Sequence, residues 1–158
     1  MMQKIRPCLW FDDLAEEAAR FYVSLFPNSE ITEISHYGPG APKPEGSVLT
    51  VGFRLDGQEF IALNGGPEFP FTEAVSFSID CGSQAEVDRY WEKLTDGGEP
   101  SQCGWLKDKY GLSWQVVPQV LIEMLQDEDG DRASRVMQAM QQMSKIDVPT
   151  LERAYAGT

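Results

Sequence analysis

The sequence predicts an α+β protein built from two copies of one unit, in which a strand and a helix are followed by three more strands. Three observations favour this fold class. Each of two amphipathic helical segments follows an alternating strand, strand-like segments follow each helix, and the two helices can be aligned. Arg20-Phe21-Tyr22 matches Arg89-Tyr90-Trp91, and Leu25 matches Leu94 at the same spacing. An internal repeat of this kind determines the whole architecture.

The first copy covers residues 1–66. Alternation of side chains predicts a strand over residues 4–11. Asp13 and Glu16 fit a capping box, and apolar residues at helical spacing extend the following helix to Pro27-Asn28. Three further strands are expected over residues 29–37, 48–55 and 58–64, with Asp56-Gly57 as the turn of a hairpin.

The second copy covers residues 73–118, and together the copies are expected to form one domain, residues 1–118. A strand over residues 74–80 precedes a helix that begins with a capping box, Ser83 with Glu86. The helix ends at Gly97-Gly98. Strands are then expected over residues 99–103, 105–109 and 112–117.

A C-terminal helical extension, residues 119–158, has no counterpart in the first copy. Helices are predicted over residues 120–126 and 132–144, with a last helical turn near residues 150–156. A stripe at helical spacing runs along the second of these helices, and we expect it to pack in a core or between subunits rather than to bind a ligand. Its members are Val136, Met137, Met140 and Met143.

Charge and cysteine content narrow the functional classes. The net charge of -12 opposes binding to nucleic acid or to anionic lipid, so neither is expected as a partner. The three cysteines, Cys8, Cys81 and Cys103, lack the spacing of a metal site. Without a leader segment or a long apolar run, the chain is expected to be cytoplasmic.

Three segments together resemble a known family. They are FDDLAEEAARFYVSLFP, IALNGGPEFPFTEAVSFSID and CGWLKDKYGLSWQVVP. They are similar to the PhnB-like branch of the vicinal oxygen chelate superfamily, whose members are often labelled 3-demethylubiquinone-9 3-methyltransferase. The resemblance implies two βαβββ modules of the glyoxalase/bleomycin resistance fold, with each sheet curled around a cavity and its helix outside. It also implies a homodimer.

Strand alternation assigns the side chains to two faces. The apolar, helix-side face is expected to hold Ile5, Leu9, Phe11, Leu49, Val51, Phe53, Val75, Phe77, Ile79, Leu112, Trp114 and Val116. The opposite face forms the cavity wall. We expect a small polar or aromatic ligand to bind there, through Arg6, Cys8, Trp10, Thr50, Arg54, Asn64, Ser76, Ser78, Trp105 and Gln115.

Metal-dependent relatives carry one ligand on each of four strands, and the resemblance places those positions on Arg6, Ala62, Ala74 and Gln115. Alanine has no donor atom, arginine stays protonated, and glutamine offers only a neutral oxygen. The sole histidine, His36, lies outside this set. We therefore expect no metal and no cofactor, and the catalytic residues, if the protein is an enzyme, stay unknown.

Several alternatives stay open. Arg6 and Arg54 either hold an anionic ligand or pair with carboxylates at the rim of the barrel. Trp10, Trp105 and Phe69 either stack on a planar ligand or belong to the core. The family label suggests a methyltransferase, although no glycine-rich turn for a nucleotide-like methyl donor joins a parallel strand to a helix. Two further alternatives are a metal-dependent lyase or dioxygenase, and an interaction module that dimerises through its tail.

Overall fold

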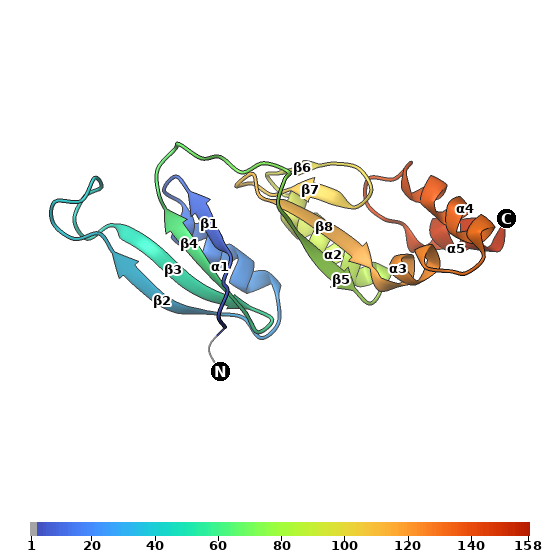
Figure 1. The fold of residues 1–158 in the computed structure, drawn as a ribbon, viewed down its shortest axis with the longest axis horizontal. Helices are drawn as coiled ribbons and strands as arrows, with labels where there is room; N and C mark the ends of the chain where they lie inside the picture. Colours follow the sequence, from blue (N-terminus) through green and yellow to red (C-terminus); the bar gives the residue numbers. More distant parts are fainter. Residues whose placement is uncertain (1–2) are drawn as a thin grey trace. The chain divides into compact units, whose positions relative to one another are not determined.

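The computed structural model describes residues 3–158 and divides into two compact units (Figure 1). The first unit ends at Pro70 and the second runs from Phe71 to Thr158. Each holds one four-stranded sheet and one long helix that packs on it. We call these units the first and the second module.

The first module has the element order strand, helix, three strands. Its elements are β1 (Cys8–Phe11), α1 (Ala15–Leu25), β2 (Glu30–His36), β3 (Val48–Leu55) and β4 (Gln58–Asn64). The sheet order is β1-β4-β3-β2, in which β1 runs parallel to β4 and the other pairs are antiparallel. Asp56 and Gly57 both have positive φ, 47° and 84°, as the tight turn between β3 and β4 requires.

The second module repeats this topology. Its elements are β5 (Ser76–Cys81), α2 (Gln84–Thr95), β6 (Glu99–Pro100), β7 (Trp105–Lys107) and β8 (Ser113–Pro118). The sheet order is β5-β8-β7-β6, again with the first strand parallel to the last. The predicted pair of βαβββ modules is therefore confirmed.

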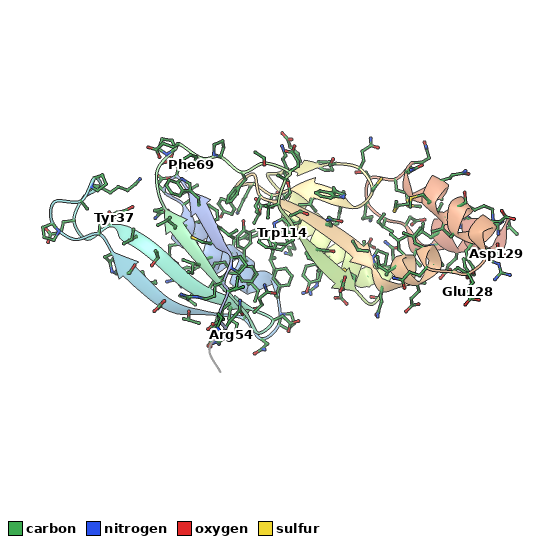
Figure 2. The ribbon with its side chains drawn as sticks, in the orientation of Figure 1. Tyr37, Arg54, Phe69, Trp114, Glu128 and Asp129 are labelled. Atoms are coloured by element: carbon green, nitrogen blue, oxygen red, sulfur yellow. The ribbon has the colours of Figure 1, made fainter. Side chains whose placement is uncertain are left out.

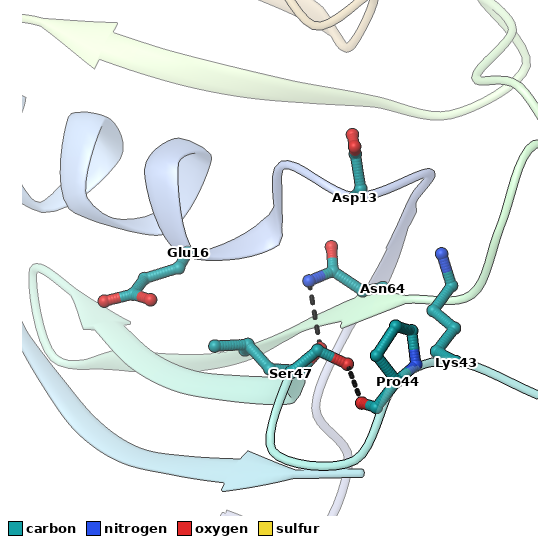
Figure 3. Close-up of a pocket in the computed structure, with 7 residues that line it drawn as sticks. Asp13, Glu16, Lys43, Pro44, Ser47 and Asn64 are labelled. Carbon is teal, nitrogen blue, oxygen red and sulfur yellow. Dashed lines mark hydrogen bonds between the residues drawn. The ribbon is translucent and has the colours of Figure 1, made fainter. Parts of the chain in front are cut away.

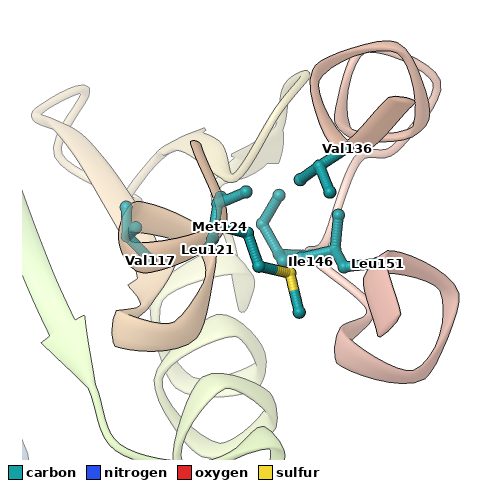
Figure 4. Close-up of a cluster of buried hydrophobic side chains, with 6 residues drawn as sticks. All are labelled: Val117, Leu121, Met124, Val136, Ile146 and Leu151. Atoms are coloured by element: carbon teal, nitrogen blue, oxygen red, sulfur yellow. The ribbon is translucent and has the colours of Figure 1, made fainter. Parts of the chain in front are cut away.

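Three helices follow β8 and pack within the second module: α3 (Gln119–Leu125), α4 (Gly130–Met140) and α5 (Val148–Ala156). Their shared core, shown in Figure 4, comprises Val117, Leu121, Met124, Val136, Ile146 and Leu151. In the predicted methionine stripe, Val136 is fully buried and Met140 and Met143 pack against this core. Met137 is 39% exposed, so only part of the stripe packs in the core.

The helix-side faces are apolar because alternate strand residues meet α1 or α2. Tyr22 of α1 packs near Phe53, whose ring stacks on Phe60 at a centroid distance of 5.3 Å. Three residues expected on these faces lie outside the strands: Leu112, which is still buried, and two that are exposed. Ile5 is 82% exposed and Val75 is 62% exposed, because β1 and β5 begin later than alternation alone indicates.

The two main helices begin in different ways. The prediction of a capping box at Asp13 and Glu16 was wrong, because the N-cap is Leu14 and no side chain of its own caps α1. Asn64, at the end of β4, accepts the Ala15 amide hydrogen at 2.8 Å instead. In the second module Ser83 is the N-cap as predicted, since Ser83 Oγ accepts from the Glu86 amide at 3.2 Å, whereas the Glu86 carboxylate accepts from the Gly82 amide at 3.4 Å.

Within residues 3–158, no helix is both long enough and apolar enough to cross a lipid bilayer.

Candidate functional site

Each sheet has a face opposite its helix, which we call the helix-free face. In the first module, register and alternation place Cys8, Thr50, Arg54 and Ile61 on it. Cys8 lies directly opposite Ile61 across the β1–β4 pair. Cys8 is exposed, and Thr50 and Arg54 are half-buried.

Both arginines of this face pair with carboxylates. Arg54, visible in Figure 2, forms ion pairs with Glu30 and, at 3.6 Å, with Glu59. Arg6 lies 4.0 Å from Glu33. The structure thus favours the alternative in which the arginines are neutralised by the protein, which leaves less positive potential for an anionic ligand.

Trp10 takes part in a packing arrangement at the end of β4. Its indole nitrogen donates to the Gly66 carbonyl at 2.8 Å, and its ring meets Phe69 edge-on at 5.0 Å. A Cβ atom on Gly65 would lie 2.4 Å from the Trp10 ring, so only glycine fits there. Trp10 is therefore engaged both with Phe69 and with the Gly65-Gly66 turn.

Two residues lie on the opposite face from the one expected. Asn64 is 6% exposed, caps α1, and donates to the Val48 carbonyl at 3.1 Å. The expected position of Asn64 on the cavity wall was therefore wrong. Ala62, two residues earlier, is fully buried on the same helix side, so Ile61 and Leu63 face the other way. None of these β4 residues supplies a metal donor on the helix-free face.

A pocket of about 360 Å³ lies at the start of α1, within the first module (Figure 3). It is lined by Asp13, Glu16, Lys43, Pro44, Ser47, Val48 and Asn64. Two of its polar side chains bond to backbone carbonyls: Lys43 donates to the Asp12 carbonyl at 3.2 Å and Ser47 to the Pro44 carbonyl at 2.6 Å. These contacts fold the β2–β3 loop over the helix end, and among the expected site residues only Asn64 lines this pocket.

The second module gathers several expected site residues on its helix-free face. Ser78 lies opposite Gln115 across the β5–β8 pair, and Trp105 lies opposite Gln115 across the β7–β8 pair. Gln115 Nε2 donates to Ser76 Oγ at 3.0 Å. Ser76, Ser78, Trp105 and Gln115 thus form one continuous polar and aromatic patch.

Ser113, which sequence reasoning did not single out, belongs to the same patch. It pairs with Ser76 on one side and Lys107 on the other, and it precedes Gln115 by two residues. Its side chain is 1% exposed, and within residues 3–158 its hydroxyl is the one buried side-chain polar atom without a hydrogen-bond partner. Alternation with Gln115 was the signal that would have identified it.

The turn that precedes this patch is organised by Asp108. The buried carboxylate accepts from the amides of Tyr110 at 2.8 Å and Leu112 at 3.1 Å. Its second oxygen accepts from the indole nitrogen of Trp114 at 2.9 Å. The charged segment between β7 and β8 is thus a structural turn that fixes the start of β8.

The thiols of Cys81 and Cys8 differ in burial, because Cys81 lies on a helix-side face and Cys8 on a helix-free face. Cys81 is buried on the helix side, and desolvation raises its pKa to about 12. Desolvation also raises the pKa of Cys8, although its side chain is exposed on the helix-free face. Within the described residues no three histidine, cysteine, aspartate or glutamate side chains come together in a way that would hold a metal ion. The positions where the resemblance implies metal ligands do not fit one either, because their donor set lacks anionic or imidazole groups.

Comparison with known proteins places this geometry in a family. The model of a family described as 3-demethylubiquinone-9 3-methyltransferase matches residues 3–117. The PhnB protein of Bacillus cereus is 40% identical, with a TM-score of 0.68 over 73% of this chain and 99% of that one. No curated protein matches the chain.

Two more distant structures share the fold. Protein PA1353 from Pseudomonas aeruginosa is 20% identical, with a TM-score of 0.60 over 74% of this chain and 98% of that one. The fosfomycin resistance protein FosX from Mesorhizobium loti is 16% identical, with a TM-score of 0.56 over 80% of this chain and 100% of that one. The chain therefore belongs to the PhnB-like family described as 3-demethylubiquinone-9 3-methyltransferase, within the vicinal oxygen chelate superfamily.

Proposed function

We propose that this protein binds a small polar or aromatic molecule on the helix-free faces of its sheets, by hydrogen bonding and stacking and without a metal ion. The observation that carries the proposal is the patch on the second module. Hydroxyl, amide and indole groups there replace the apolar layer that would cover a purely structural sheet face.

The chemistry of the patch favours an uncharged ligand. Its side chains are neutral except for Lys107, which is paired with Glu73. On the first module the two arginines are likewise paired with glutamates. A carboxylate or phosphate ligand would have to displace one of these partners and approach a chain of net charge -12.

The metal content of the purified protein tests this proposal. We expect far less than one zinc, manganese, nickel or iron ion per chain, and no change in melting temperature when each ion is added alone. One equivalent of metal per chain that disappears in Gln115→Ala would contradict metal-free binding. Ser24→Ala, on the first module's helix, is the control for nonspecific loss of metal.

The family description supports a second candidate, a methyltransferase. Titration calorimetry with S-adenosylmethionine distinguishes it from simple ligand binding. Saturable binding of the donor near one equivalent per chain favours the transferase. Absence of heat at about millimolar donor, corresponding to binding weaker than about 4 kcal/mol, argues against it.

A further inference from the structure

The strongest unexplained feature of the molecule is the Ser113 hydroxyl. A buried hydroxyl without a partner is destabilising, because it has lost its hydrogen bonds to water and gained none in return. In residues 3–158 no other buried side-chain nitrogen or oxygen is in this state. Such an atom needs an explanation, and a missing ligand group is one of the few available.

One ion pair is formed by the neighbour of Ser113 on β7. Strand β8 lies between β5 and β7 in the sheet. Lys107, the last residue of β7, pairs with Glu73, which precedes β5, so their contact lies at the end of the sheet where β8 begins. Lys107 lies directly opposite Ser113, and opposite residues of an antiparallel pair point to the same face. The Glu73–Lys107 pair, which we call the strap, therefore lies next to Ser113.

The strap is formed by side chains that are partly exposed to solvent. The Lys107 side chain is 39% exposed and that of Glu73 is 62% exposed, so the contact is of the weak, salt-sensitive class. The hydrogen bond between them lowers the pKa of Glu73 and raises the pKa of Lys107. Both groups are thus charged at neutral pH. The strap is lost as the pH falls through the lowered pKa of Glu73, below 4.5, or rises through the raised pKa of Lys107, above 10.5.

Two further groups near Ser113 have no protein partner within the described residues. The indole nitrogen of Trp105 and the side-chain oxygen of Gln115 make no hydrogen bond to residues 3–158, whereas Gln115 Nε2 is used by Ser76. Trp105 and Gln115 are opposite each other, and Ser113 is on the same face. The patch thus presents one donor, one acceptor and one hydroxyl that can be either, next to an aromatic ring.

We propose that Ser113, Gln115 and Trp105 form a subsite for a planar, uncharged amide or heteroaromatic group, and that the Glu73–Lys107 strap gates it. This inference rests on the proposed ligand-binding function and names its chemical class. A planar amide supplies an adjacent donor and acceptor, and it stacks on an indole without requiring a counter-charge. A carboxylate has no donor and would meet the Gln115 oxygen and Glu73.

Benzamide and benzoate test the class of ligand, because they share one ring and differ in the neutral amide and the charged carboxylate. Proton–nitrogen NMR spectra of the full chain report the binding site, with the Trp105 indole signal identified by its loss in Trp105→Phe. We expect benzamide to shift this signal and the amides of residues 113–115 in a saturable way. We expect benzoate to bind at least about tenfold more weakly.

Ser113→Ala tests the hydroxyl itself. We expect benzamide to bind about fivefold more weakly, as for the loss of one neutral hydrogen bond. The melting temperature should stay equal or rise, because the variant removes an unpaired buried hydroxyl. Ser24→Ala is the matched control, since its hydroxyl bonds to the Phe21 carbonyl in the first module.

Glu73→Gln tests the gate. We expect it to tighten benzamide binding about two- to threefold at low salt, because Ser113 is uncovered without the cost of breaking an ion pair. In the unaltered protein, raising salt from about 0.05 to 0.5 M should tighten binding of the neutral probe by a similar factor, and Glu73→Gln should abolish this dependence. Glu92→Gln, an exposed charge change on α2, is the control.

Three results would overturn the subsite. They are equal affinity for benzoate and benzamide, unchanged benzamide affinity in Ser113→Ala, and no saturable shift on the second module at about 50 mM benzamide. If in that third case benzamide shifts are confined to the first module, the proposed metal-free ligand binding stays in place. Stoichiometric metal at Gln115 would instead overturn the proposed function.

Discussion

The first module builds its sheet from long strands, whereas the second combines short strands with a helical tail. Strands β2, β3 and β4 have seven, eight and seven residues, but β6 and β7 have only two and three. Beside β7, the tail supplies backbone hydrogen-bond partners that the short strands lack. The amides of Cys103 and Gly104 donate to the carbonyls of Met143 and Ser144, both at 2.8 Å.

This difference shows that the tail is part of the second module's architecture in this chain. Gln84 of α2 ties it from the other side, because its amide donates to the Ile146 carbonyl at 3.0 Å and accepts from the Val148 amide at 2.6 Å. The family model ends at residue 117, so the tail lies beyond the matched region. One topology is therefore stabilised by strand length in one copy and by added helices in the other.

The largest expected effect comes from the turn of the second module. Asp108→Ala should lower the free energy of unfolding by about 3–5 kcal/mol, because three donors lose a buried charged acceptor. Asp108→Asn, which keeps one acceptor oxygen, should cost less. Chemical denaturation measures both, with Asp56→Asn in the first module's turn as the control. Equal stability of Asp108→Ala and the unaltered protein would contradict a structural role.

The tail gives the next largest effect. Ile146→Ala should cost about 2–4 kcal/mol, because Ile146 is fully buried and packs beside Gly104. Hydrogen exchange resolved by residue should show faster opening of the second module with the first module unchanged. Ile5→Ala, at an 82% exposed position, is the control and should change little. Equal loss of protection in both modules would contradict separate stabilisation.

The helix caps allow a direct comparison between modules. Asn64→Ala should cost about 1–2 kcal/mol, since it removes the cap of α1 and leaves the Val48 carbonyl without its donor. Ser83→Ala should cost about 1 kcal/mol, because only a local cap is lost. Thermal unfolding of both variants shows which substitution costs more stability. A larger cost for Ser83→Ala would contradict the role of Asn64 as a link between β4 and α1.

The reactivity of the cysteine thiols gives the smallest expected effect, a difference in alkylation rate between Cys81 and Cys8. Folded Cys81 should resist alkylation at about pH 8, because its pKa is raised to about 12 and its side chain is buried. Cys8 is exposed and should react under the same conditions, although its own raised pKa slows it. Mass spectrometry of the alkylated protein measures this, and equal labelling of Cys81 and Cys8 in the folded state would contradict their opposite faces.

Much of the fold follows from local pattern. The segments 48–55 and 58–64 were predicted with the bounds that β3 and β4 have, because their alternation ends at the Asp56-Gly57 turn. The strands expected over 99–103 and 105–109 are shorter in the structure, at Glu99–Pro100 and Trp105–Lys107. Cys103 and Gly104 have positive φ there and bond to the tail, a long-range contact that no local pattern reveals.

The candidate site was predictable where alternation could be counted from a well-defined strand. Ser76, Ser78, Trp105 and Gln115 share one face as expected. Asn64 and Ala62 were placed on the wrong side, because β4 was counted in the opposite phase. The strap beside Ser113 joins Glu73, before β5, to Lys107 at the end of β7, so only the strand order could reveal it.

The most direct test of ligand binding by hydrogen bonds without metal is a benzamide titration followed by NMR, repeated after exhaustive treatment with a chelator. Metal-free binding predicts saturable shifts at Trp105 and around Ser113 and Gln115, with the same affinity before and after metal removal. Binding that disappears with the chelator and returns on addition of zinc or manganese would contradict it.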